Sequence, residues 1–203
     1  MASIQTKVTV LQNMIEREAA DANRATASLR DDLVAEALRG AAALVRERRR
    51  ALLEANATDC DAAAGRLDEG TLDRLRLDDA RVEGLARQVE TVAEIEPLER
   101  EIGSWTLPNG LLVSERRIPI GTVGANFEAR PNVALDVAGQ LLKSLNTVVL
   151  RTGGAALRTV TVLVDEVLRP ALETAGLPPG AYRSPCIPNW RSTRPPVAAR
   201  RTW

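Results

Sequence analysis

Residues 120–154 read IGTVGANFEARPNVALDVAGQLLKSLNTVVLRTGG, and this stretch decides the fold. It opens on an apolar run that ends at Phe127 and continues, after a polar loop, into helical spacing from Val133 to about Leu142. A second apolar run, Val148–Leu150, leads into a glycine-rich loop at 151–154. Strand, loop, helix, strand and glycine-rich loop predict two buried parallel strands joined by a helical crossover.

The two loops, 128–132 and 151–154, follow the carboxyl ends of the predicted strands. In an open α/β sheet a ligand lies outside that edge, so the polar and glycine residues gathered there mark a candidate site. Downstream, we expect a helix from about Ala155 to Ala175, closed by the glycines and prolines of 176–180, and a third strand near Ala181. The sequence therefore predicts an α/β fold.

The residues before this stretch have a helical pattern from about Val10 to Glu101. Ser28 followed by Asp31 and Asp32 predicts a capped helix start. Further helices are expected over Val45–Ala57 and Asp79–Ala93, with turns at Gly65 and Gly70. Residues 110–120 alternate loosely, as an edge strand does, with Pro119 suited to its end.

The composition narrows the classes of function. Of 203 residues, 45% are apolar and 27% charged, and the formal net charge is zero, which favours a globular chain without a nucleic-acid or anionic-membrane surface. The sequence has no histidine, which excludes an imidazole base or ligand, and we predict no metal site. Two cysteines make no disulfide framework, and the N-terminus has no signal-peptide pattern, so we expect a cytoplasmic protein.

Residues 183–203 depart from this pattern, with five Arg, four Pro and two Trp and with no Asp, Glu, Leu or Gly. The prolines permit neither a central strand nor a regular helix. We favour the interpretation that a shifted reading frame produced this aberrant tail, which the coding DNA around Tyr182 would reveal. The alternative is a basic arm that contacts a phosphate-rich partner.

Two motifs lie at the predicted site. Gly153-Gly154 allows a phosphate to approach the backbone ahead of a helix N-terminus, but an ordinary turn is the stronger interpretation, because the G-x-G-x-x-G fingerprint is absent. Pro131-Asn132 is more specific, because it ends the strand's loop and opens a helix.

The stretch LLVSERRIPIGTVGANFEARPN, residues 111–132, resembles the aldehyde dehydrogenase superfamily: an extended arm, a Pro-Ile-Gly turn, a strand and then Pro-Asn. EARPN followed by LDVAGQLLKSLNTVVLRTGG is similar to one family in particular, the γ-glutamyl phosphate reductases of proline biosynthesis. Runs at Leu53–Asp59, Leu72–Leu77 and Leu177–Gly180 also match that family. The resemblance covers about residues 17–182 and implies a helical segment followed by an incomplete Rossmann-like parallel sheet.

The resemblance implies a reaction and roles for residues. In that family NADPH reduces an acyl thioester, formed when a cysteine attacks L-glutamate 5-phosphate, to glutamate 5-semialdehyde. Asn132 matches the amide that holds the oxyanion. Arg151 is a candidate partner for the 2′-phosphate of NADP and, as an alternative, an ordinary exposed loop residue. Arg130 is a candidate for the substrate's carboxylate or phosphate and, as an alternative, a loop brace with Glu128. The cofactor-contacting edge comprises Phe127, Pro131, Asn132, Arg151, Thr152, Gly153 and Gly154.

The family's nucleophilic cysteine belongs to a later domain, beyond position 182. Cys60 is better explained as a small buried residue, and Cys186 lies in the aberrant tail. We therefore expect three parts: 1–102 as the N-terminal helical part of a cofactor domain, 103–182 as a partial NAD(P)-binding α/β region, and 183–203 as the tail. Such a chain is expected to be inactive and to lack the segment that closes the family's oligomer. The alternative is a non-catalytic fragment that binds nucleotide or associates with a reductase subunit.

Overall fold

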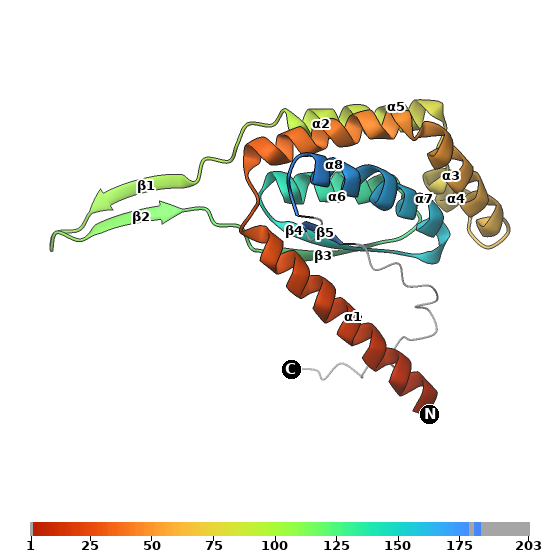
Figure 1. The fold of residues 1–203 in the computed structure, drawn as a ribbon, viewed down its shortest axis with the longest axis horizontal. Helices are drawn as coiled ribbons and strands as arrows, with labels where there is room; N and C mark the ends of the chain where they lie inside the picture. Colours follow the sequence, from red (N-terminus) through yellow and green to blue (C-terminus); the bar gives the residue numbers. More distant parts are fainter. Residues whose placement is uncertain (1, 179–180, 184–203) are drawn as a thin grey trace.

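The computed structural model describes residues 2–178 and 181–183. Five helices come first, then an antiparallel hairpin, and then alternating strands and helices (Figure 1). The helices are α1 (Ala2–Thr26), α2 (Asp31–Glu47), α3 (Arg49–Ala63), α4 (Glu69–Leu75), α5 (Asp79–Ala93), α6 (Asn132–Lys143), η1 (Gly154–Ala156), α7 (Leu157–Val162), the π-helical segment η2 (Leu163–Leu168) and α8 (Arg169–Thr174). The strands are β1 (Glu101–Thr106), β2 (Leu112–Arg116), β3 (Thr122–Phe127), β4 (Thr147–Thr152) and β5 (Tyr182–Arg183).

A three-stranded parallel sheet, in the order β3-β4-β5, forms the base of the site. β4 is the central strand, and Thr147–Leu150 are buried. β5 pairs with Val148 and Val149, which confirms the third strand expected near Ala181. The predicted strands, the crossover helix α6 and the helical segment after β4 are all present. The chain therefore has the α/β fold that the sequence predicts.

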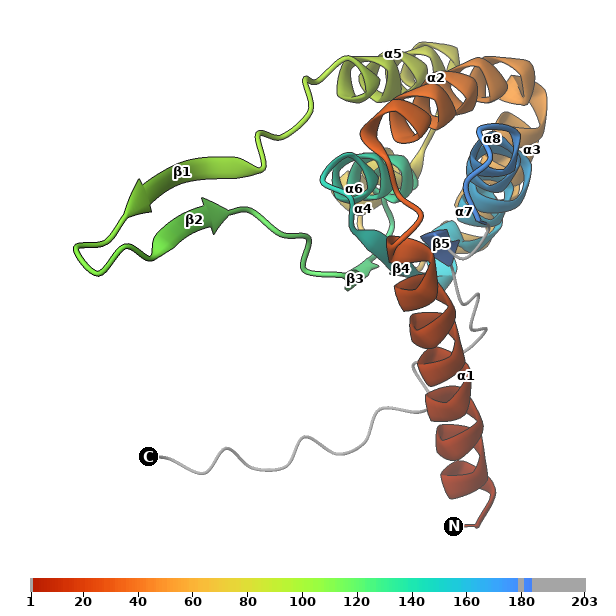
Figure 2. The same cartoon turned by 60° about the vertical axis from the view of Figure 1, so that its left-hand side comes forward.

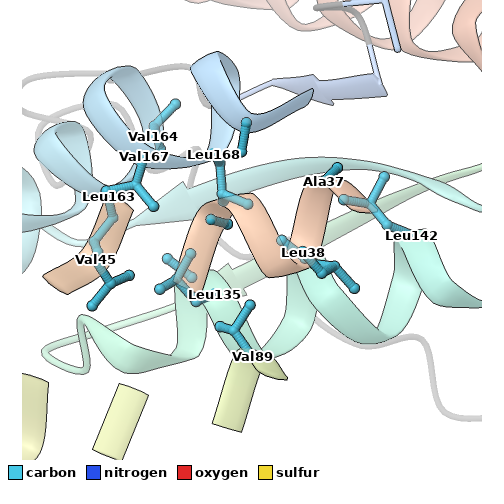
Figure 3. Close-up of a cluster of buried hydrophobic side chains, with 14 of the residues drawn as sticks. Ala37, Leu38, Val45, Val89, Leu135, Leu142, Leu163, Val164, Val167 and Leu168 are labelled. Atoms are coloured by element: carbon cyan, nitrogen blue, oxygen red, sulfur yellow. The ribbon is translucent and has the colours of Figure 1, made fainter. Parts of the chain in front are cut away.

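Helices cover the sheet in two layers on one face. α6 and α8 lie between the sheet and the pair α2 and α5, whereas α1 lies on the other side (Figure 1). α2 is at the centre of the core: Ala37, Leu38 and Val45 point toward side chains of α5, α6 and η2 (Figure 3). One buried cluster includes residues from α2, α5, α6, β4 and η2, so the helical first half and the sheet share a single core.

The amino ends of β3 and β4 are fixed by a short chain of hydroxyl groups and by one amide. Thr147 Oγ1 lies 3.2 Å from Thr26 Oγ1 at the end of α1 and 2.9 Å from Thr122 Oγ1. Gly121 has φ +110°, which requires glycine, and its N–H donates to Asn146 Oδ1 at 3.0 Å. These contacts set where the two strands begin.

Several boundaries differ from those the sequence predicts. α2 begins at Asp31 with Arg30, not Ser28, at the N-cap, because the Ser28 N–H still bonds the carbonyl of Ala25 at the end of α1. Asp31 instead forms an ion pair with the buried Lys143 of α6, with 2.9 Å between Oδ2 and Nζ. α3 spans 49–63 rather than 45–57. Gly65 is a turn with φ +71°, but Gly70 lies inside α4.

The segment before the sheet also differs from expectation. β2 pairs only with β1, and this hairpin projects from the body of the chain (Figure 2). Ile118 and Ile120 are 81% and 87% exposed, so the run at 120–127 is not buried throughout. β3 begins at Thr122 and is partly exposed because it is an edge strand in the described sheet. Within the described residues, no helix is long and apolar enough to cross a membrane.

Because α2 lies at the centre of the core, truncating one of its buried side chains is expected to destabilise the fold. Leu38 is 1% exposed, so Leu38→Ala is expected to lower the free energy of unfolding by ~2–5 kcal/mol through lost burial and a residual cavity. Leu112, which is 65% exposed on the hairpin, is the matched control, and Leu112→Ala is expected to change it by less than ~0.5 kcal/mol. Urea unfolding followed by circular dichroism measures both. Equal effects would contradict this core.

Candidate functional site

The two loops predicted to form a site lie side by side at the carboxyl edge of the sheet. β3 and β4 are in register, so that Phe127 stands opposite Thr152. Just beyond, the N–H of Gly153 donates to the carbonyl of Phe127 at 3.1 Å. Parallel pairing thus brings residues 128–132 and 151–154 together, although eighteen residues separate them along the chain.

The first loop makes a tight turn from β3 into α6. Ala129 is 2% exposed and has φ +52°, a left-handed conformation that costs a residue with a Cβ about 1 kcal/mol or more. Pro131 is buried at the N-cap of α6, and Asn132 is the first helical residue. Arg130, which lies between Ala129 and Pro131, is exposed. The loop holds Pro131 and Asn132 in place while Arg130 faces solvent.

The side-chain amide of Asn132 is oriented from within its own helix. Its Nδ2 donates to Oδ2 of Asp136, one turn later, at 3.1 Å. Oδ1 of Asp136 is buried and has no hydrogen-bond partner among the described residues. Burial raises the pKa of Asp136, and the hydrogen bond from Asn132 opposes that rise. Because an amide nitrogen carries two N–H donors, Asn132 keeps one for another oxygen.

The segment 151–154 carries a cation and a close contact, but Arg151 and Thr152 are the last residues of β4 rather than loop residues, and Gly154 begins η1. Nη1 of Arg151 donates to Oδ1 of Asn126 on β3 at 3.1 Å, and burial lowers the pKa of Arg151 while Glu128 opposes that shift. A Cβ added at Gly153 would lie 2.7 Å from Cγ of Glu128. Glycine at 153 therefore lets Glu128 cross onto the second loop. Thr152 is buried and Gly154 is exposed.

The helix that follows Gly154 begins against a carboxylate. Oδ2 of Asp59, from α3, accepts from the N–H of Thr159 at 2.9 Å and from its hydroxyl at 2.8 Å, and Oδ1 accepts from the N–H of Arg158 at 3.3 Å. These are donors that a phosphate would use at a helix N-terminus. Since Asp59 occupies them, the contact favours Gly153-Gly154 as a turn rather than as a pyrophosphate cradle.

A groove that the sequence analysis missed opens beside Asn132. It has a volume of ≈ 380 Å³ and lies along α4 and α5. Its lining includes Arg74, Arg76, Arg81, Gly84, Gln88 and Asn132. Arg81, Gly84 and Gln88 follow helical spacing of three and four residues, which is the signal in the sequence that places them on one face of the helix.

Cys60 lies outside this groove, on α3. It is partly buried, its Sγ donates to Oδ1 of Asn56 at 3.6 Å, and burial raises the pKa of its thiol. Cys60 therefore packs against the core but is partly buried rather than fully buried as expected. Cys186 and the tail from residue 184 lie outside the described residues. In the part of the chain that the structure describes, no three Cys, Asp or Glu side chains are grouped to hold a metal ion.

No protein-family model matches the chain. A γ-glutamyl phosphate reductase from Erythrobacter litoralis is 41% identical over 167 residues, which are 82% of this chain and 39% of that protein. Another from Clavibacter michiganensis is 49% identical over 173 residues, with the same two shares. The chain therefore resembles the γ-glutamyl phosphate reductases over 82% of its own length. It spans about two fifths of the length of these relatives.

Solved reductases of this family have the same fold. The crystal structure of γ-glutamyl phosphate reductase from Thermotoga maritima gives a TM-score of 0.78 at 32% identity and covers 83% of this chain and 42% of that one. A glyceraldehyde-3-phosphate dehydrogenase from Methanocaldococcus jannaschii, solved in complex with NADP, gives 0.59 at 17% identity and covers 85% of this chain and 36% of that one, a likeness of fold alone. The resemblance to the γ-glutamyl phosphate reductase family and the aldehyde dehydrogenase-type fold, both expected from residues 111–154, are confirmed.

The burial of Asp136 next to Asn132 predicts a pH dependence of stability. Its pKa in the folded chain is raised above the ordinary 3.8, so this group's contribution to stability is complete below pH 3.8 and is lost as the pH rises through the folded-state pKa. Asp136→Asn removes the titrating group, so its free energy of unfolding should fall less than that of the wild type over this interval. Urea unfolding at a series of pH values measures the difference.

The exposed Asp165 provides the control, because it pairs with Arg169 on the surface of η2 and α8. Asp165→Asn is expected to keep the wild-type slope of stability against pH. Parallel curves of unfolding free energy against pH for the wild type and Asp136→Asn would show that burial does not raise the pKa of Asp136.

Proposed function

We propose that this chain supplies the cofactor edge and the oxyanion donor of an NADP-dependent γ-glutamyl phosphate reductase. The reaction is reduction of L-glutamate 5-phosphate to L-glutamate 5-semialdehyde. The observation that carries the proposal is the meeting of loops 128–132 and 151–154, with Asn132 at the same time on a cationic groove. The identity to reductases over 82% of the chain supports it.

The carboxyl edge fits a nucleotide in part. Arg151 offers a guanidinium for a ribose 2′-phosphate, and Glu128, whose side chain lies against the buried Gly153, offers a carboxylate. The edge does not offer a helix N-terminus for the pyrophosphate, because Asp59 takes those donors. NADP would therefore be held through Phe127, Pro131 and residues 151–154, and when bound it would supply the hydride.

Asn132 suits the role of oxyanion donor. Its amide is fixed by Asp136, and one N–H remains to stabilise negative charge on an acyl oxygen. Loss of one preorganised donor of this kind typically costs ~3 kcal/mol of transition-state stabilisation. Arg130 is a weaker candidate for substrate binding, because it is exposed and does not line the groove beside Asn132.

The chain alone is proposed to be inactive in this reduction, because the thioester step needs a thiolate. Cys60 lies outside the groove, and burial raises its pKa, which disfavours the thiolate. The alternative function is a non-catalytic fragment that binds nucleotide or associates with a reductase subunit. The hairpin favours association with a reductase subunit over nucleotide binding, because it exposes the apolar side chains of Ile102, Trp105 and Leu112.

Binding of NADPH tests the cofactor edge. We expect saturable binding of NADPH by the chain, followed through nicotinamide fluorescence. Arg151→Gln is expected to weaken NADPH binding by about tenfold or more with little effect on NADH, since a hydrogen bond to a charged group contributes ~1.5–3 kcal/mol. Arg50→Gln, which removes a surface arginine paired with Glu54 on α3, should change neither.

The expected lack of turnover is tested with the same protein. NADPH oxidation in the presence of freshly generated γ-glutamyl phosphate is expected to stay at the rate measured without protein. Cys60→Ser should leave that rate unchanged. A protein-dependent rate that Cys60→Ser abolishes would show that Cys60 is a nucleophile after all.

A further inference from the structure

The groove along α5 is built from a regular helical face. Arg81, Gly84 and Gln88 lie along it, the segment after α4 contributes Arg76, and Asn132 lies at the start of α6. Its volume of ≈ 380 Å³ lies in the range of ~300–1,000 Å³ typical of small-molecule sites. The groove therefore joins a set of cationic side chains to the proposed oxyanion donor.

The three arginines of the groove are not equivalent. Nη2 of Arg81 lies 3.0 and 3.2 Å from the two carboxylate oxygens of Asp73, and its Nη1 donates to the carbonyl of Arg76 at 2.7 Å. Arg81 is therefore neutralised and serves to hold the chain around residues 73–76 against α5. Arg74 bonds the hydroxyl of Thr71 at 2.8 Å.

Two arginines of the groove, Arg74 and Arg76, belong to none of the ion pairs found among the described residues, and Arg74 is held by the hydroxyl of Thr71. Arg76 is the more available cation for a ligand. Its side chain is exposed. With Asp73 as the one carboxylate of the lining, and that carboxylate paired with Arg81, the groove carries net positive charge. Gln88, one turn beyond Gly84, adds an uncharged side chain that can donate through its amide.

The floor of the groove is open at Gly84. No atom lies within 4 Å of a Cβ built there, so a side chain at 84 would enter the free space. Leu77, which is partly buried, and Leu85, which is 4% exposed, add apolar atoms to the lining. A short aliphatic chain that ends in an anion matches this combination of apolar lining and charge.

We propose that this groove binds the carboxylate-bearing end of an amino-acid acyl substrate, with Arg76 as its ion-pair partner and Gln88 as a second donor. The aliphatic part of the substrate lies over Gly84, and its acyl oxygen reaches Asn132. The proposal rests on the proposed function, which assigns Asn132 to the reacting carbonyl. In this proposal Arg76, rather than Arg130, is the residue that selects an anionic substrate.

Two amides of glutamate, compared with inorganic phosphate, show which end of the ligand the groove binds. Ligand-detected NMR titrations of the full chain would use L-glutamine, which keeps the α-carboxylate, L-isoglutamine, which replaces it with an amide, and inorganic phosphate. We expect saturable binding of L-glutamine and at least about tenfold weaker binding of L-isoglutamine, because the latter lacks the group that pairs with Arg76. Phosphate and L-isoglutamine can also be compared as competitors of bound L-glutamine. Displacement by phosphate at the lower concentration would further support an anion site.

Variants locate that binding in the groove. Arg76→Gln is expected to weaken L-glutamine binding by about tenfold or more, and Gly84→Leu to abolish it by filling the space while leaving every charge in place. Arg87→Gln, which removes a charge from the same helix outside the groove, and Arg130→Gln should have no effect. Circular dichroism and thermal unfolding establish that each variant is folded.

The outcomes of this experiment are separable from those of the NADPH titration. NADPH binding with no L-glutamine binding, or with equal binding of L-glutamine and L-isoglutamine, overturns the groove and leaves the cofactor edge standing. L-glutamine binding that depends on Arg76 without NADPH binding supports the groove and removes the cofactor edge. A loss of binding in folded Arg130→Gln but not in Arg76→Gln places the carboxylate on the loop and overturns the proposal.

Discussion

The parallel pairing of β3 with β4 is the constraint on which the rest of the structure depends. At the amino end the N–H of Thr147 bonds the carbonyl of Gly121, and at the carboxyl end the N–H of Gly153 bonds the carbonyl of Phe127, both near 3 Å. Between these two bonds the register is fixed, so α6 must begin at Asn132 and return over the sheet. A slip of one residue would exchange the side chains that β4 presents to the helices on its two faces, both of which are buried. Helix packing on α2 then follows from where α6 lies.

The same pairing divides the surroundings of Asn132 into two chemically different sides. On one side the ends of the strands present Arg151 and Glu128, and the side chain of Glu128 lies against the buried Gly153. On the other side α4 and α5 present a groove with net positive charge. Asp136 lies behind Asn132 and has one buried oxygen without a partner, a desolvation cost that stability alone does not explain. Placing the amide of Asn132 at a fixed angle between the two sides is a physical reason to bear that cost.

Sequence patterns predict the parts of this fold that depend on local signals. Asp78 caps α5 at the expected residue because its side chain bonds the N–H of Arg81 at 2.7 Å, and Pro131-Asn132 opens α6 as expected. Ser28 failed as a cap because its own N–H still belongs to α1, which no local pattern reveals. The groove was missed because Arg76 and Arg81 come from different elements, and the role of Asp59 was missed because its partners lie about one hundred residues away. Tertiary contacts, rather than propensities, decide such features.

We propose that loops 128–132 and 151–154 form one ligand-binding edge. Hydrogen–deuterium exchange of the chain with and without NADPH tests it most directly, because it reports opening of individual backbone segments. The account predicts slower exchange in both loops and in the first turn of α6, with the projecting hairpin at 101–116 unchanged. Slower exchange confined to the hairpin or to α3, or no change in either loop at a saturating NADPH concentration, would contradict it.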